Sequence, residues 1–276
     1  MQKVSTHRFL REATQPLHDE VEACSPFQIL LDPQRAADIT LGHYVDLLQD
    51  LHEVFSCLEP LAEEAVLTSP PFVHAFRQTE RLIYEDFFRR RQLVDHDLAW
   101  LDAPLRRPRA SLDELERSLG RASRETRFGV AYVLMGQSLG TAMICRTMLA
   151  GNRTVIRTVA PCLADTLVAE HQGVESGPRS GSGSGSGSGA ASRSVTQSKP
   201  PLPPPFSFLG GYGKRSARDW SLFLEALEEV VPAHDEGALQ QALAGAQAAF
   251  GAFLSVWGGP ATCQVVPSPP SSECHL

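Results

Sequence analysis

Apolar residues recur at helical spacing over most of residues 9–171, and this periodicity leaves room for little other than helices. The clearest stretch places them three and four residues apart, at Tyr44, Leu47, Leu48, Leu51, Phe55, Leu58 and Leu61. Such spacing draws one apolar stripe along an α-helix. No segment of this region alternates as a half-buried strand does, so the sequence predicts an all-α helical bundle.

The expected helices are separated by proline-containing breaks at 69–71 and 104–110. We expect helices over 14–30, 40–66, 72–93, 111–120, 125–150 and 155–171. Helical spacing resumes at 220–230 and again at 238–257. The bundle therefore continues after a long interruption.

That interruption, residues 173–205, is a Gly/Ser repeat followed by a proline-rich run. It lacks the apolar residues needed to build a core and is expected to be a flexible, disordered insertion. The part after it offers about 60 foldable residues, which is few for an independent core. We therefore expect one domain over 1–258, interrupted by this insertion, and a disordered tail over 259–276.

The charge balance excludes some functions. Lys and Arg number 25 against 32 Asp and Glu, a formal net charge of −7, whereas domains that bind nucleic acid usually carry a basic excess. No run approaches the roughly 20 apolar residues of a membrane span, and no signal peptide is visible at the N-terminus. The sequence predicts a cytoplasmic protein that binds neither nucleic acid nor membrane.

The first candidate for chemistry is His18, in the run Arg11 to Glu22. Pro16 fits the first turn of a helix and Thr14 is a natural N-cap, which would place His18 one turn inside. Its neighbours Leu17 and Val21 form an apolar flank. A single histidine of this kind is usually structural, so a ligand role requires a second element.

That element is the segment 128–144, which is apolar on nearly every side and is expected to be a central helix. Gly136 and Gly140 stand four residues apart on it, and each costs about 1 kcal/mol of helix propensity relative to Ala. One interpretation is a close approach between helices through small residues. The other is a bare backbone strip for a flat cofactor, next to the polar pair Gln137 and Ser138.

Four segments together resemble the heme oxygenase family, over residues 8–170 and 206–250. The run LREATxxLHDEVE, at Leu10 to Glu22, is similar to the family's proximal helix, and YVLxGxxLG, at Tyr132 to Gly140, to the distal helix of its bacterial members. Residues 91–101 and 206–223 resemble two further family segments.

The resemblance implies that His18 is the axial ligand of the iron of heme b, and that Gly136, Gln137 and Gly140 lie over the opposite face. Arg11 matches a basic residue near a heme propionate. The other heme contacts that the resemblance implies are Thr14, Tyr132, Tyr212, Lys214 and Arg218. Thr141 and Met135 depart from the family pattern, which frequently has Gly and Glu there.

The implied activity is cleavage of heme by O2 and reducing equivalents to biliverdin, carbon monoxide and ferrous iron. Electrons would come from a ferredoxin, flavodoxin or flavin reductase, because the chain has no flavin or nucleotide motif. The biliverdin would supply a bilin-binding phytochrome, or the reaction would release iron. Two alternatives remain: a heme carrier or sensor without turnover, and a purely structural bundle.

Overall fold

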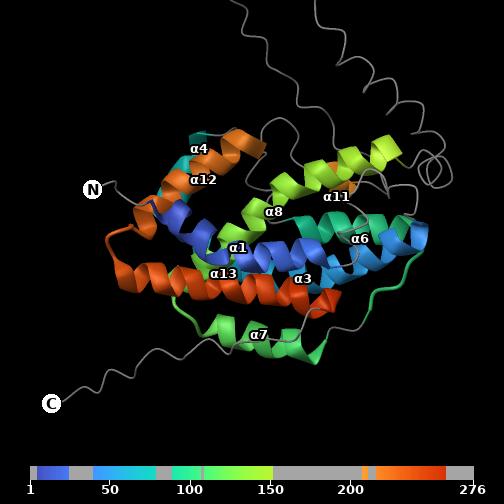
Figure 1. Ribbon diagram of the computed structural model, residues 1–276, viewed down its shortest axis with the longest axis horizontal. Helices are drawn as coiled ribbons and strands as arrows, with labels where there is room; N and C mark the ends of the chain where they lie inside the picture. The colour runs from blue at the N-terminus through green and yellow to red at the C-terminus, as the bar shows by residue number, and fades with distance from the viewer. Residues whose placement is uncertain are drawn as a thin grey trace, which may run out of the picture.

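Every regular element that the structure describes is an α-helix, which confirms the all-α class. The computed structural model describes residues 5–24, 40–78, 89–106, 109–151, 207–210 and 216–258, without the side chains of 138–151, 209–210 and 216–217. Its helices are α1 (Thr6–Ala23), α3 (Leu41–Leu67), α4 (Pro70–Gln78), α6 (Arg90–Trp100), α7 (Ala110–Gly120), α8 (Arg124–Gly151), α11 (Ser207–Gly210), α12 (Ser216–Val230) and α13 (Glu236–Trp257). Figure 1 shows their arrangement.

Helix α1 begins eight residues before the expected start, so the prediction of Thr14 as N-cap is wrong. Ser5 is the N-cap and accepts from the backbone N–H of Arg8. Thr14 is buried in the helix interior, where its hydroxyl donates to the carbonyl of Leu10 at 2.8 Å. Pro16 lies inside the helix, and His18 more than three turns from its start.

Contacts with the end of α12 explain why α1 begins well before Pro16 and contains the proline in its interior. The backbone N–H of Thr6 donates to Glu228 at 2.7 Å, and the Thr6 hydroxyl donates to the carbonyl of Val231 at 2.5 Å. Leu10 is fully buried. These interactions offset the roughly 3 kcal/mol that a proline inside a helix costs, and local sequence does not reveal them.

Other boundaries follow the periodicity closely, in α3, α7, α8 and α13. A continuous helix over 72–93 is wrong, because Arg89 is a non-helical N-cap of α6, which begins at Arg90; residues 79–88 lie outside the description. The expected helix 14–30 ends too late, because α1 ends at Ala23 and Cys24 is its extended C-cap. Residues 25–30, the helix over 155–171, the insertion 173–205 and the tail 259–276 lie outside the described residues.

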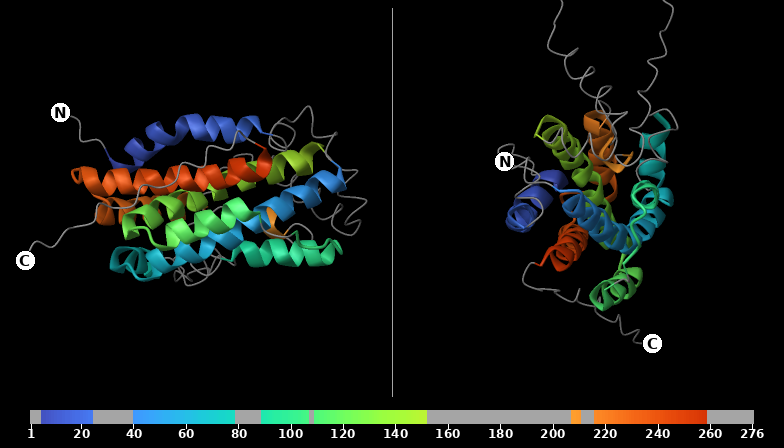
Figure 2. Two further views of the ribbon diagram at one scale, coloured as in Figure 1. Left: turned by 90° about the horizontal axis from the view of Figure 1, so that it is seen from below. Right: turned by 90° about the vertical axis from the view of Figure 1, so that its right-hand side faces the viewer.

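Helix α13 packs against both α1 and α8, and one hydrophobic cluster joins residues from Leu10 to Trp257. Figure 2 shows α1 beside α13. The helices that follow residue 205 therefore share a core with those that precede it. Among the described helices, none combines the length and apolar character that crossing a bilayer requires.

The contact between α8 and α13 depends on two glycines. A Cβ on Gly245 would lie 1.7 Å from the backbone oxygen of Thr126, and a Cβ on Gly129 would lie 1.8 Å from that of Ala242. Both distances are far below van der Waals contact. The two backbones therefore touch directly, and this crossing sets where α8 lies on α13.

Candidate functional site

His18 lies on the exposed side of α1, and a carboxylate stands beside it. Its side chain is 50% exposed, and Nδ1 is 3.7 Å from Oε1 of Glu22, one turn further along. The ring packs edge-on against Phe250 of α13, with centroids 6.1 Å apart. Histidines that bind metals usually direct their second ring nitrogen to a carboxylate, so this arrangement leaves Nε2 as the ligand atom.

Arg11 shares a face of α1 with His18, because seven residues are close to two full helical turns. It is exposed, and its positive charge acts on two rings near the start of the helix. Burial lowers the pKa of His7 and the charge of Arg11 lowers it further. Burial raises the pKa of Tyr132 to about 12, against the charge of Arg11. The guanidinium of Arg11 is therefore close enough to α8 to influence one of its side chains.

Tyr132 and Gly136 lie one turn apart on α8, where α1 and α12 meet that helix. The Tyr132 ring is 6.1 Å from His7 and 5.4 Å from Trp220 of α12. A Cβ on Gly136 would lie 3.6 Å from the Trp220 indole, which is ordinary contact. Gly136 is thus a site where a side chain approaches, whereas direct backbone contact occurs at Gly129. The C-terminal end of α8 lies away from α1 (Figure 1).

Gln137 does not stand alone beside the glycines, because Arg90 donates to its Oε1 from α6. Arg90 is only 2% exposed, and its guanidinium lies over the Phe55 ring, 5.8 Å from the centroid. Glu59 of α3 accepts the backbone N–H groups of Arg90 and Arg91 at 3.0 and 3.1 Å. Burial raises the pKa of Glu59 to about 7, against the charge of Arg90.

Asp97 joins two of the segments that carry the family resemblance. It is fully buried on α6, and its two carboxylate oxygens accept the backbone N–H groups of Ser207 and Phe208 at 3.0 and 2.9 Å. Ser207 and Phe208 are the first residues of α11, and the first N–H groups of a helix have no acceptor within the helix. The Asp97 carboxylate supplies that acceptor. Burial raises the pKa of Asp97, and these hydrogen bonds oppose the shift.

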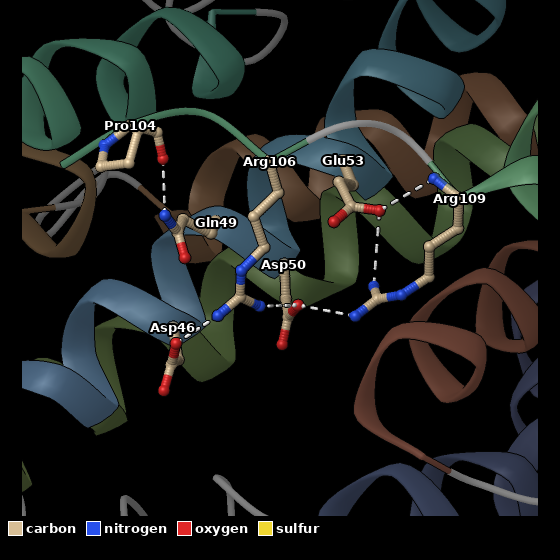
Figure 3. Close-up of polar contacts among 7 residues, drawn as sticks. All are labelled: Asp46, Gln49, Asp50, Glu53, Pro104, Arg106 and Arg109. Carbon is tan, nitrogen blue, oxygen red and sulfur yellow. Dashed lines mark hydrogen bonds and ion pairs between the residues drawn. The ribbon is translucent and has the colours of Figure 1, made fainter.

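A second polar cluster lies on α3, at the link between α6 and α7 (Figure 3). Arg106 pairs with Asp46 and Asp50, and Arg109 with Asp50 and Glu53. Burial raises the pKa of Asp50, while the hydrogen bond and charge of Arg109 oppose the shift. Each carboxylate already has a guanidinium partner, so the cluster fastens the link to α3 and offers no evident reactive group.

The remaining predicted residues fall into three groups. Arg218 is exposed on α12, and Met135 is buried in the core. Gly140 is on α8 one turn beyond Gly136, but the surroundings of residues 138–151 lie outside the description, as do Tyr212 and Lys214. The structure brings Arg11 close to Tyr132, and His18 lies two turns along α1.

Sequence reasoning missed Glu59 and Arg90. Arg90 belongs to the run Arg89-Arg90-Arg91, where nothing distinguishes the buried arginine from its neighbours. Its partners stand 31 and 47 residues away in the sequence. The only local sign is that a glutamate occurs on the apolar stripe of α3.

No family model, curated protein or solved structure matches the chain. The likeness of four segments to heme oxygenases therefore remains a resemblance, and an assignment of function rests on the geometry of the residues.

Proposed function

We propose that the chain binds heme through His18 and cleaves it to biliverdin, carbon monoxide and ferrous iron. The observation that carries the proposal is the His18–Glu22 pair on the open side of α1. A carboxylate lies 3.7 Å from Nδ1, within reach of a hydrogen bond after a small movement of either side chain, and Nε2 is then the atom left for iron. In the described residues, no hydrogen-bond partner stands at Nε2.

The surroundings of His18 suit a flat ligand that is apolar at its centre and acidic at its edge. Leu17 and Val21 flank the histidine as partly buried apolar residues, and Phe250 supports the ring from α13. Arg11, two turns earlier on the same face, supplies a guanidinium for a carboxylate, which is a strong, charge-assisted contact. Thr14 lies between Arg11 and His18, but its hydroxyl already donates to the backbone carbonyl of Leu10.

The second wall in this proposal is α8. Tyr132, Gly136 and Gly140 recur every four residues and so share one face of the helix. Gly136 faces the Trp220 indole, so Gly140, one turn further, is where the helix backbone would approach the ligand, while Arg11 and His18 hold it from α1. Arg218 is a further candidate for a propionate contact, as are Tyr212 and Lys214.

Heme, when bound, supplies both the iron that activates O2 and the ring that is cleaved. The chain's part is to hold the imidazole, pair the propionates and limit water at the reacting face. A separate donor of the ferredoxin, flavodoxin or flavin reductase class provides the electrons.

The test is a titration of the full chain with hemin, followed by absorption, for wild type, His18→Ala and a control. His234→Ala is a suitable control, because His234 is also exposed but lies in the turn between α12 and α13. The proposal predicts a 1:1 Soret complex for wild type and His234→Ala, and a lost or altered complex for His18→Ala. The absence of any wild-type complex would refute heme binding.

Adding a reducing system in air then separates enzyme from carrier. Conversion of the Soret band into a biliverdin band over several turnovers supports the enzyme, whereas a stable reduced complex would make the chain a carrier or sensor. Gly140→Leu should impair this conversion more than it impairs folding. An unchanged biliverdin yield from that variant would contradict the placing of α8 over the heme.

A further inference from the structure

Arg90 occupies an unusual position for an arginine, since it is 2% exposed and lies between three helices. A guanidinium this deeply buried is strongly unfavourable unless charge and hydrogen bonds compensate it. Glu59 provides the opposite charge from α3, and its two oxygens hold the first two N–H groups of α6. The start of α6, and with it the Arg90 backbone, is therefore fixed on α3.

The Arg90 side chain then reaches α8. It donates from Nη1 to Oε1 of Gln137, and the Phe55 ring lies 5.8 Å from its guanidinium carbon. The aromatic face restricts where the guanidinium can lie, and the planar group offers donors in fixed directions. Gln137 is thereby held at a defined distance from α3 and α6.

Gln137 is a special point along α8. The first half of the helix is locked on α13, where Gly129 and Gly245 allow direct backbone contact. Residue 136, the neighbour of Gln137, faces the Trp220 indole of α12. The middle of α8 is thus held by Arg90 through Gln137 and contacted by Trp220, and the half that carries Gly140 extends from this point.

We propose that Arg90 is a positioning residue, which sets where the glycine-bearing half of α8 lies by holding Gln137. On the proposed function, that half covers the reacting face of heme. Arg90 then influences which ring carbon is attacked, without contacting heme itself. Only this second consequence rests on the proposed function.

The first readout needs no heme. In a chain carrying Trp100→Phe and Trp257→Phe, Trp220 is the only tryptophan and reports its contact with Gly136. Arg90→Met and Gln137→Leu should each shift Trp220 emission to longer wavelength and raise its quenching by acrylamide. The double variant should show no more than the larger single effect, because both changes remove the same contact.

Arg127→Met is the matched control. Arg127 also joins α8 to α3, through Glu64 at 2.7 Å, but does so in the first turn of α8. Its loss should leave Trp220 emission unchanged. If Arg90→Met does not fold, Gln137→Leu carries the test. Unchanged Trp220 emission in every folded Arg90 and Gln137 variant, or the same shift in Arg127→Met, would overturn the proposal.

The second readout is the ratio of biliverdin isomers formed by the hemin complex. Arg90→Met should change this ratio while the hemin dissociation constant stays the same, and Arg127→Met should change neither. An unaltered ratio would overturn the role toward heme and leave the proposed function intact. Failure of wild type to bind hemin would instead sink the proposed function, and Trp220 emission alone would then decide the role of Arg90.

Discussion

The crossing of α8 and α13 makes a sharp prediction for Gly245→Ala. The added methyl group would lie 1.7 Å from the oxygen, 2.7 Å from the carbonyl carbon and 3.1 Å from the Cα of Thr126. All three are backbone atoms of a long helix and cannot rotate away. Overpacking of this kind costs about 1–3 kcal/mol or more, which outweighs the gain of about 1 kcal/mol in helix propensity.

Gly251→Ala is the matched control, since it lies on the same helix with nothing within 4 Å of its added Cβ. It should stabilise the protein by up to about 1 kcal/mol. Because both substitutions gain helix propensity, the two variants should differ by the overpacking cost, about 1–3 kcal/mol or more in the free energy of unfolding, measured by urea denaturation with circular dichroism. Because each kcal/mol shifts Tm by about 2–4 °C in a domain of this size, thermal melts should rank them in the same order.

The same reasoning predicts strong coupling between the two glycines. Gly129→Ala alone should be as harmful as Gly245→Ala, because its Cβ would meet backbone atoms of Ala242 and Ala246. Once one methyl group has pushed the helices apart, the second meets less resistance, so the double variant should cost less than the sum. Wild-type stability for Gly245→Ala, or additive losses in the double variant, would show that the backbones do not touch as described.

Three further predictions concern buried or capping polar groups. Because the pKa of Glu59 is about 7 in the folded chain and near 4.5 in the unfolded one, the folded state binds the proton more tightly. The contribution of Glu59 to stability is therefore complete below about pH 4.5 and falls by roughly 3 kcal/mol as the pH rises through 7, a dependence that Glu59→Gln should lack in denaturation at several pH values. Asp97→Ala should remove two charge-assisted hydrogen bonds and speed amide exchange in α11 more than in α13, at a cost of about 2–5 kcal/mol. Ser5→Ala should cost about 1 kcal/mol in thermal denaturation, because it removes the N-cap of α1.

Periodicity predicted the helices whose ends depend on local signals. The break between α3 and α4 falls at Thr68 and Ser69, directly before Pro70, and α13 starts after a capping aspartate, Asp235. Periodicity did not predict the helix ends that tertiary contacts determine. Hydrogen bonds from Thr6 to the end of α12 stabilise the part of α1 that precedes Pro16. Glu59 fixes the start of α6 at Arg90, because it accepts the first N–H groups of that helix.

The candidate site shows the same division. His18 and Glu22 are one turn apart on a helix, so their proximity could be predicted from the sequence. The link from Glu59 through Arg90 to Gln137 joins three helices, and no short-range pattern marks it. Gln137 itself was identified as a polar neighbour of the glycines, but its partner was not.

The glycines of α8 show why residue type alone does not assign a role. Gly129 and Gly136 are seven residues apart on one helix and therefore share nearly the same side. Gly129 meets the backbone of α13, where a Cβ has no room, whereas Gly136 meets a tryptophan side chain at 3.6 Å. Alanine should therefore be excluded at 129 and accepted at 136 with a small shift of Trp220. The first half of α8 is consequently fixed on α13 by direct backbone contact, whereas at residue 136 the helix meets α12 through a side chain that can shift.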